Sequence, residues 1–407
     1  MLFDDVDPYP QPNVIVIDAE SPPMDGVPTD TATLFEPLAV KQVTLRNRIV
    51  MSPMTRRFSP GGIPTEEVAN YYLRRVHGGV GLIVTEGVGI DHPAALDDSG
   101  IPVMYGPDAL AGWKKTVDVV HDAGGVIFPQ LWHMGPMRKS GQGPYPNAPS
   151  MRPSGLWGPV GDNVVWNLDQ EQVSKEREPT APMSHREIDA VIEGYVRSAV
   201  SAKQVGFDGI AIHGAHGYMP DAFLWSGTNQ RSDRYGGDIA QRTVFVQEMI
   251  RAIRDAIGTD MPIMLRFSQW KQQDYAAKLV HTPQELEQLL LPISAAGVDI
   301  FDASTRWFWK PEFPGSDLNL AGWAQKITGK PAMTVGSVGL SNDLYEALEK
   351  GCAEFVDLAA LMEKFNRGDF ALVGVGRALL SDPAFANKIR SGGQPAAFDR
   401  KCIQTLT

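Results

Sequence analysis

The sequence is poor in cysteine and has no long hydrophobic run. Only Cys352 and Cys402 occur among its 407 residues, and no apolar stretch approaches the ~18 residues that a membrane-spanning helix needs. Without a CxxC pair or a Cys/His zinc spacing, a cysteine-bound zinc or iron–sulfur site has no ligands. Two isolated cysteines fit a reducing compartment, and the acidic, proline-broken N-terminus lacks the features of a secretory signal. We therefore expect a cytoplasmic protein without membrane contact.

Positive charge is also in deficit. Lys and Arg number 37 against 48 Asp and Glu, and the resulting net charge of −11 disfavours generic binding to nucleic acid or anionic lipid. Motifs of nucleotide-binding and hydrolase folds are missing, since there is no G-x-G-x-x-G after a strand, no G-x-x-x-x-G-K-[ST] and no G-x-S-x-G. A hydrophobic fraction of 43% nevertheless supplies a large core and excludes an intrinsically disordered chain.

Short, nearly continuous hydrophobic runs recur along the chain, and most are followed by a longer helical segment. Such runs are typical of strands buried on both faces of a parallel sheet. They cover residues 48–52, 80–86, 125–132, 207–213, 262–267, 298–304, 331–335 and 369–375. The length alone allows two or three domains. Eight strands alternating with helices instead predict one (β/α)₈ barrel, the TIM barrel of the α/β class.

Helix signals between the runs agree with this prediction. Residues 185–206 begin after Ser184, a good N-cap, and end at Gly206, a good C-cap. Residues 238–258 and 282–297 follow the same plan.

Two segments fall outside the repeat. Residues 1–33, rich in Pro, Asp and Thr, are expected to form either a surface arm or an arm that covers a pocket or a neighbouring subunit. The connection 133–184 is long and rich in Gly, Pro, Met and Trp, which is typical of a functional loop or lid. The predicted organisation is an N-terminal extension over 1–33 and a single barrel domain with long capping loops over 34–400.

The carboxyl ends of the strands carry the active site in such barrels. Polar residues at these ends are rich in hydrogen-bond donors and nearly lack carboxylates, which suits an anionic or carbonyl-rich ligand and not a divalent metal. The set comprises Thr55, Glu86, Gly87, Gln130, His213, Arg266, Asp302, Ser304, Gly336, Ser337, Gly376 and Arg377. Glycine-bearing turns at 334–339 and 373–380 follow the last two strands, where barrels often bind phosphate.

The segment 213-HGAHGY-218 is the sharpest local feature. A metal-binding pair on a helix is disfavoured, because the two glycines oppose helix formation. The histidines are then either hydrogen-bonded loop residues without a role or, as we prefer, two donors aimed at one acceptor oxygen, His213 and His216. Tyr218 is normally protonated at pH 7 and is a candidate proton donor.

Two features leave alternatives open. Arg266 lies inside an apolar strand, where an arginine must be paired with either a bound anion or a structural carboxylate. The run 306-RWFWK-310 forms either pocket lining or loop packing, and Trp132 and Tyr105 are weaker candidates of the same kind.

Several ordered motifs resemble the Old Yellow Enzyme family, FMN-dependent ene-reductases on a (β/α)₈ barrel. The similarity extends from about Leu34 to Pro383, and the missing cysteines argue against the larger relatives that carry an iron–sulfur cluster. The motifs are 46-RNRIVMSPMTR-56, 71-YYLRR-75, 82-LIVTEG-87, 129-PQLWHMG-135, 213-HGAHGYMPDAFLWSGTNQRSDRYGGDIAQR-242 and 374-GVGRALLSDP-383.

The resemblance implies roles for the matching residues. His213 and His216 would bind the carbonyl oxygen of the substrate, and Tyr218 would protonate its α-carbon. Gln130 and Arg266 would contact the pyrimidine part and the N1–C2 carbonyl region of FMN. The other implied FMN contacts are Pro53, Met54, Thr55 and Gly87 at the ring and Gly336, Ser337, Gly376 and Arg377 at the phosphate. No metal is implied.

The implied activity is reduction of the activated C=C bond of α,β-unsaturated carbonyl compounds. It would follow a ping-pong hydride transfer in which NADH or NADPH first reduces FMN. Alternatives are a reductase of nitro compounds or nitrate esters, a dehydrogenase or demethylase of a small substrate, and a flavin-binding redox sensor without turnover. A homodimer is one assembly left open. The physiological substrate, nicotinamide preference and stereoselectivity are not defined by the sequence.

Overall fold

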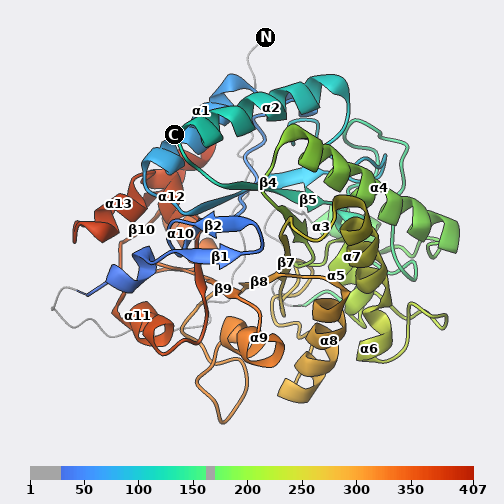
Figure 1. The fold of residues 1–407 in the computed structure, drawn as a ribbon. Helices are drawn as coiled ribbons and strands as arrows, with labels where there is room; N and C mark the ends of the chain where they lie inside the picture. The colour runs from blue at the N-terminus through green and yellow to red at the C-terminus, as the bar shows by residue number, and fades with distance from the viewer. Residues whose placement is uncertain (1–28, 162–169) are drawn as a thin grey trace.

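The eight hydrophobic runs form the eight parallel strands of a closed barrel in the computed structural model, which describes residues 29–161 and 170–407. Strands adjacent in sequence are adjacent in the barrel, and the last closes it by pairing with the first. The strands are β3 (Ile49–Met51), β4 (Leu82–Gly89), β5 (Ile127–Trp132), β6 (Ile210–His213), β7 (Ile263–Phe267), β8 (Ile300–Ser304), β9 (Ala332–Val335) and β11 (Leu372–Val375). Figure 1 shows them at the centre of a ring of helices. The predicted (β/α)₈ barrel is confirmed.

The outer ring consists of helices, and two of them begin and end where the capping signals predict. The ring comprises α1 (Glu66–His77), α2 (Pro107–Asp122), α4 (His185–Val205), α7 (Val244–Ile257), α8 (Pro283–Ala296), α9 (Leu320–Thr328), α11 (Ala359–Asn366), α12 (Ala378–Ser381) and α13 (Phe385–Arg390). Ser184 and Glu187 form a capping box at the start of α4, and Gly206 ends it in the left-handed conformation. Thr282 caps α8 by accepting a hydrogen bond from the backbone of Glu285.

The segment 238–258 departs from the single helix predicted for it. It forms α6 (Ile239–Arg242) and then α7, with a break at Thr243. The Thr243 hydroxyl donates to the carbonyl of Ala240, and its backbone N–H bonds to the carbonyls of Ala240 and Gln241. The side chain therefore competes with the regular helical pattern, which the hydrophobic periodicity alone does not reveal.

A hairpin covers the amino-terminal end of the barrel. Its strands β1 (Leu38–Val40) and β2 (Val43–Leu45), drawn in blue in Figure 1, pair in antiparallel fashion. Val40, Val43 and Leu45 pack against inward side chains that come from all eight barrel strands. These are Val50, Leu82, Val84, Phe128, Ala211, Met264, Ile300, Met333 and Leu372. The lower barrel is thus a filled core, and the opposite end is left for a site.

The connection 133–184 after β5 is held by buried arginines. It includes η3 (Gly135–Met137) and α3 (Gln170–Arg177), while 162–169 lie outside the described residues. Arg138 donates to four carbonyl groups within the connection, and Arg152 pairs with Glu176 at 3.2 Å. The remaining short elements are η1 (Ala32–Phe35), η2 (Pro60–Gly62), α5 (Met219–Leu224), α10 (Leu344–Lys350), η4 (Arg400–Gln404) and the pair β10 (Cys352–Ala353) with β12 (Phe398–Asp399).

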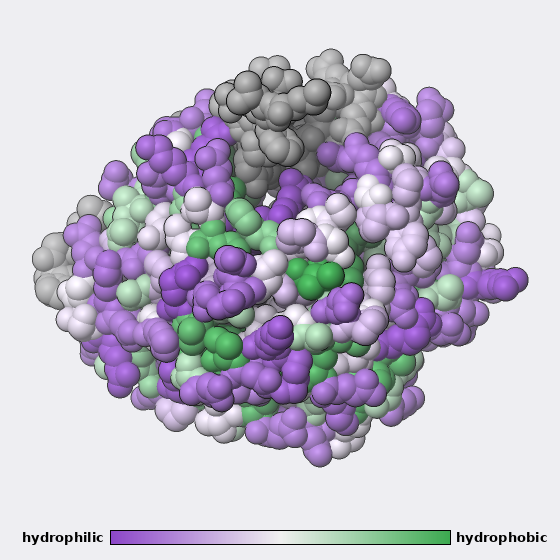
Figure 2. Space-filling view, turned by 90° about the horizontal axis from the view of Figure 1, so that it is seen from above, coloured by the Kyte–Doolittle hydropathy of each residue, from purple (hydrophilic) through white to green (hydrophobic). Residues whose placement is uncertain are grey.

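The predicted arm lies mostly outside the described part of the chain, which begins at residue 29. Thr29 donates a hydrogen bond to Asp357, and Thr31 donates to the carbonyl of Ile389. Across residues 29–161 and 170–407, no helix is both long and apolar enough to cross a bilayer. On the face drawn in Figure 2, hydrophilic side chains predominate and hydrophobic ones form small scattered groups.

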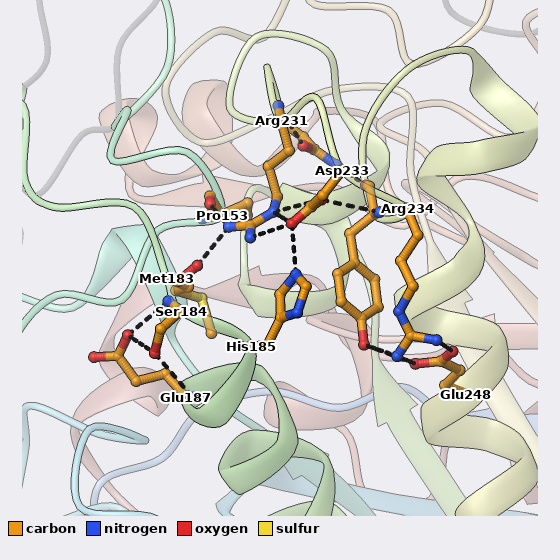
Figure 3. Close-up of polar contacts among 11 residues, drawn as sticks. Pro153, Met183, Ser184, His185, Glu187, Arg231, Asp233, Arg234 and Glu248 are labelled. Carbon is orange, nitrogen blue, oxygen red and sulfur yellow. Dashed lines mark hydrogen bonds and ion pairs between the residues drawn. The ribbon is translucent and has the colours of Figure 1, made fainter.

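A polar cluster joins the segment after α5 to the start of α4 (Figure 3). Arg231 donates to the carbonyl groups of Pro153 and Met183 and pairs with Asp233, which also accepts from His185 at 2.8 Å. The bonds from Arg231, followed by that from His185, hold the pKa of Asp233 below its ordinary range. The second half of the long motif 213–242 therefore holds neighbouring segments of the fold together.

Candidate active site

Two adjoining cavities lie at the carboxyl ends of the barrel strands. Their volumes are about 470 and about 230 Å³, within the ~300–1,000 Å³ scale of small-molecule sites when taken together. The larger is lined by Pro53, Met54, Thr55, Gln130, His213, His216, Tyr218, Arg266 and Arg377, and the smaller adds Gly336, Ser337 and Gly376. Of the residues with an implied role toward FMN or substrate, all except Gly87 line one of the two cavities.

The turn after β6 brings the predicted catalytic side chains together. His216 and Gly217 have φ of 66° and 84°, so the chain reverses within the left-handed region that glycine tolerates best. The ring centre of His213 lies 5.0 Å from that of His216 and 4.6 Å from that of Tyr218. Burial lowers the pKa of both histidines well below the ordinary value, so both imidazoles are neutral at physiological pH. Each neutral ring retains one N–H donor.

The two histidines have different surroundings. His216 stacks on Trp270 with ring centres 4.0 Å apart, and its Nε2 lies 2.9 Å from the hydroxyl of Ser304. The Nδ1 of His213 is buried and has no hydrogen-bond partner in the described structure. The hydroxyl of Ser304 thus helps to orient the ring of His216, a contact that the Nδ1 of His213 lacks among the described residues.

Tyr218 presents a protonated phenol to the larger cavity. Its side chain is 8% exposed, and burial raises its pKa above the ordinary value. Its oxygen accepts a hydrogen bond from Nε2 of Gln272. Its ring packs edge-to-face with that of Trp132, with the two ring centres 4.9 Å apart. The phenol therefore holds its proton at neutral pH and is fixed on two sides.

Of the two partners that the sequence allowed for Arg266, the structure shows the structural carboxylate. Its Nε donates to Asp302 at 2.6 Å, and both side chains are buried. Arg266 also lines both cavities, which Asp302 does not. The ion pair explains how the arginine is tolerated in a hydrophobic strand, and its charge still faces the site.

Gln130 and Gly87 sit opposite each other on paired strands but differ in access to the site. Within the described part of the chain, the Nε2 of Gln130 is buried and has no hydrogen-bond partner, although Gln130 lines the larger cavity. A Cβ on Gly87 would lie 2.4 Å from the ring of Trp132. Gly87 therefore makes room for Trp132, and its implied contact with the FMN ring stays a prediction.

The turns after β9 and β11 form the smaller cavity. Gly336 has φ of 145°, and a Cβ there would lie 2.7 Å from the Thr305 hydroxyl, so the turn requires glycine. Ser337 also has a positive φ, of 51°. Arg377 donates to the carbonyls of Asn342 and Asp343, and burial lowers its pKa to about 10, which still leaves it charged at neutral pH.

The aromatic run 306–310 proves to be loop packing. Phe308 is 3% exposed, and Trp309 packs against the same core. Neither they nor Trp307 line the two cavities, whereas Arg306 lines the smaller one. Of the weaker aromatic candidates, Trp132 lines the larger cavity, and Tyr105 lines a separate surface cavity.

Among the lining residues that the sequence analysis missed, three lie in one loop: Trp270, Gln272 and Tyr275. They belong to the loop directly after β7, where only Arg266 was singled out. The rule that active sites follow strand ends would have pointed to this loop, but its irregular pattern does not show which side chains turn inward. Glu86, singled out at the end of the second run, lies behind the lining and accepts bonds from the backbones of Arg56 and Arg57.

The closed parallel barrel with donors converging at its carboxyl end defines a TIM-barrel protein with a small-molecule site. Residues 33–362 match the NADH:flavin oxidoreductase / NADH oxidase family, and the chain belongs to this family. The resemblance to the Old Yellow Enzyme family is thereby confirmed.

Individual relatives agree with this assignment. The chain is 38% identical to 12-oxophytodienoate reductase 7 of Oryza sativa subsp. japonica over 59% of this chain and 60% of the relative. It is 32% identical to NADH oxidase of Thermoanaerobacter brockii over 92% of this chain and 53% of the relative. The chain thus spans little more than half the length of these curated relatives. The crystal structure of Old Yellow Enzyme from Pichia sp. AKU4542 has the same fold, with a TM-score of 0.74, 24% identity, and coverage of 91% and 90% of the two chains.

The residues that line the two cavities fit FMN, the cofactor that the NADH:flavin oxidoreductase family implies. Gln130 lines the larger cavity and carries an amide donor that has no partner among the described residues, which suits the carbonyl-rich edge of a flavin. The space at Gly376 is open, with only Met54 Sδ 3.7 Å from where a Cβ would lie, and the charged Arg377 is adjacent. This combination suits a phosphate. Within the described residues, no group of three His, Cys, Asp or Glu side chains is arranged to hold a metal ion.

Proposed function

We propose that the protein is an NAD(P)H-dependent FMN enzyme that reduces the activated C=C bond of α,β-unsaturated carbonyl compounds. The observation that carries the proposal is a group of three side chains that line the larger cavity, two neutral imidazoles and a protonated phenol, whose ring centres lie within 6.4 Å of one another. Neutral donors suit a carbonyl oxygen that gains negative charge, and a phenol suits proton transfer to carbon.

FMN would be held by the residues that line the two cavities. Pro53, Met54 and Thr55 would contact its ring, and Gln130 and Arg266 its pyrimidine side. The turns at 336–337 and 376–377 would hold its phosphate. When bound, FMN would supply the electron-transfer chemistry, taking electrons from NADH or NADPH and passing them to the substrate.

The chain's own side chains would bind and protonate the substrate. His213 and His216 would donate hydrogen bonds to the carbonyl oxygen and so polarise the conjugated C=C bond. Tyr218 would donate its proton at the α-carbon. Because all three are at most 9% exposed, the reacting atoms would be shielded from bulk water.

The deciding experiment is an anaerobic titration of purified protein with NADH and with NADPH, followed by cyclohexenone. The flavin absorbance should bleach with a nicotinamide and return with the enone. Flavin that bleaches but is reoxidised by nitro compounds and by no enone would favour the nitroreductase alternative. Flavin that neither nicotinamide bleaches would favour a redox sensor.

Arg377→Ala tests the phosphate assignment. Loss of the guanidinium should lower the affinity for FMN, by roughly 10–100-fold for one hydrogen bond to a charged acceptor. Flavin content after dialysis measures this, with Arg251→Ala on the exposed face of α7 as the control. A fully loaded Arg377→Ala protein would show that the phosphate lies elsewhere.

A further inference from the structure

We infer that Gln272 is a further catalytic residue, which directs the proton of Tyr218 to the substrate and stabilises the tyrosinate that remains. The inference rests on the proposed function, because it concerns the protonation step of that reaction. It starts from one contact, in which the Nε2 of Gln272 donates to the phenol oxygen of Tyr218.

The direction of this hydrogen bond determines its consequence. A phenol oxygen that accepts from an amide has its own O–H free to point elsewhere. Tyr218 and Gln272 line the same cavity, as does His213, so the free O–H has the substrate space before it. An acceptor at position 272 would instead draw the proton away from the substrate.

The proton transfer balances without any further reagent. The O–H bond of Tyr218 breaks while a C–H bond forms at the α-carbon of the substrate enolate, and the electron pair of the O–H bond stays on the phenol oxygen. The hydrogen bond from Gln272 then becomes a bond to a charged oxygen, which is stronger than a bond to a neutral one. Water returns the proton to Tyr218 after product leaves.

The surroundings make such a donor necessary. Burial raises the pKa of Tyr218, and the nearby carboxylate of Asp97 raises it further. Gln272 opposes both, followed by the more weakly acting Arg57. The adjacent rings of His213 and His216 are neutral and offer no compensating charge.

The loop that carries Gln272 is anchored on both sides of it. Lys271 and Gln273 are fully buried; Lys271 Nζ bonds Asp221 at 2.8 Å, and Gln273 Nε2 bonds the carbonyl of Trp157 at 3.0 Å. The backbone N–H of Gln272 donates to the carbonyl of His216 at 3.2 Å. The amide of Gln272 is therefore held in a fixed relation to the turn that bears Tyr218.

The experiment compares Gln272→Met, Gln272→Glu and Tyr218→Phe as FMN-loaded enzymes in anaerobic stopped flow. Flavin reduction by NADPH, which takes no proton from Tyr218, is measured separately in each variant so that the two half-reactions can be compared. Reoxidation by cyclohexenone should slow roughly 10–100-fold in Gln272→Met, the effect of one hydrogen bond to a charged group. It should slow more in Gln272→Glu, because a carboxylate only accepts. In the Tyr218→Phe background, Gln272→Met should have no further effect.

Other outcomes separate the possible failures. Equal reoxidation rates in wild type and Gln272→Met would overturn the inference, as would a slowing that persists undiminished in the Tyr218→Phe background, which would indicate a direct substrate contact. Absence of enone turnover in wild type would instead reject the proposed function. Gln42→Met, on the exposed hairpin at the other end of the barrel, is the matched control.

A readout without turnover completes the test. The side-chain amide signal of Gln272 in a ¹⁵N spectrum is identified by its loss in Gln272→Met. Tyr218→Phe should shift this signal, because the acceptor oxygen is gone. An unshifted signal would mean that the hydrogen bond is not formed in solution, and the inference would fall.

Discussion

The histidine–tyrosine group shows how single residues obtain reactivity from burial. The same removal from water lowers the pKa of His213 and His216 and raises that of Tyr218. The two imidazoles therefore stay neutral and the phenol keeps its proton over a wide pH range. A site built in this way donates hydrogen bonds without adding net charge.

Tyr218→Phe should separate binding from proton transfer. The phenylalanine keeps the packing against Trp132 and His213, so FMN should bind and be reduced as before. Turnover of cyclohexenone should fall by roughly 10²–10⁴-fold, the usual contribution of a general acid. Steady-state kcat with excess NADPH measures the effect, and unchanged turnover would remove Tyr218 as the proton donor.

Glu86 is a second residue whose burial has a measurable consequence. Burial raises its pKa from 4.5 to about 7, against the opposing bonds from the backbones of Arg56 and Arg57, and its Oε1 has no hydrogen-bond partner among the described residues. Because the folded-state pKa lies above the unfolded value, this group's stabilising contribution is complete below pH 4.5 and is lost as the pH rises through 7.

Glu86→Gln should therefore gain stability relative to wild type as the pH rises. A glutamine oxygen can still accept the two backbone bonds and carries no buried charge. Between pH 5 and pH 8 the difference in unfolding free energy should move in favour of the variant by roughly 2–3 kcal/mol. Urea unfolding at the two pH values measures it. Exposed Glu287→Gln should show no such change, and a pH-independent difference for Glu86→Gln would contradict the account.

At the scale of elements, the barrel strands were predictable and the loops above them were not. Nearly continuous hydrophobic runs identified all eight strands, because a strand buried on both faces has few polar positions to interrupt it. The break at Thr243 and the inward side chains of 268–275 depend on individual hydrogen bonds. Hydrophobic periodicity carries no signal for such contacts.

The loops after β6 and β7 are joined by a buried ion pair, Lys271 and Asp221. Neither side chain is exposed, and Asp221 also accepts a bond from the backbone of Gly217 at 2.6 Å. Burial lowers the pKa of Lys271 and raises that of Asp221, while their mutual attraction opposes both changes. The pair fixes the turn that bears His216 and Tyr218 against the loop that bears Gln272.

Lys271→Met should leave an uncompensated buried carboxylate and destabilise the protein by about 3–5 kcal/mol. Combining it with Asp221→Asn should recover most of this loss, since asparagine can still accept from Gly217 without charge. Urea unfolding of the single and double variants measures the coupling. Lys278→Met, which breaks a more exposed pair with Glu312, should cost much less. A double variant as unstable as Lys271→Met would show that the charge is not the cause.

At the scale of the whole molecule, the site depends on contacts between residues very distant in sequence. Arg56 follows the first barrel strand and donates to the carbonyl of Cys402, 346 residues later, and to those of Ile403 and Thr405. The motifs around Arg56 pointed to a ligand site, but nothing local in the sequence pairs its guanidinium with the end of the chain. The order of strands predicts the barrel. The contacts that close its carboxyl end run to backbone carbonyl groups, which every residue has, so the sequence does not mark them.

Deletion of residues 403–407 should therefore loosen the site as well as destabilise the fold. It removes acceptors from Arg56, Arg74 and Arg75, of which Arg56 and Arg75 are buried. The loss should amount to roughly 1.5–3 kcal/mol for each charge-assisted bond that water does not replace. FMN retention should fall too, because the backbone of Arg56 continues directly into Thr55 in the cavity wall. Ile403→Ala removes a lining side chain but keeps every carbonyl, so it should be much milder. If it matched the deletion in urea unfolding and flavin content, packing and not the arginine–carbonyl bonds would hold this end of the barrel together.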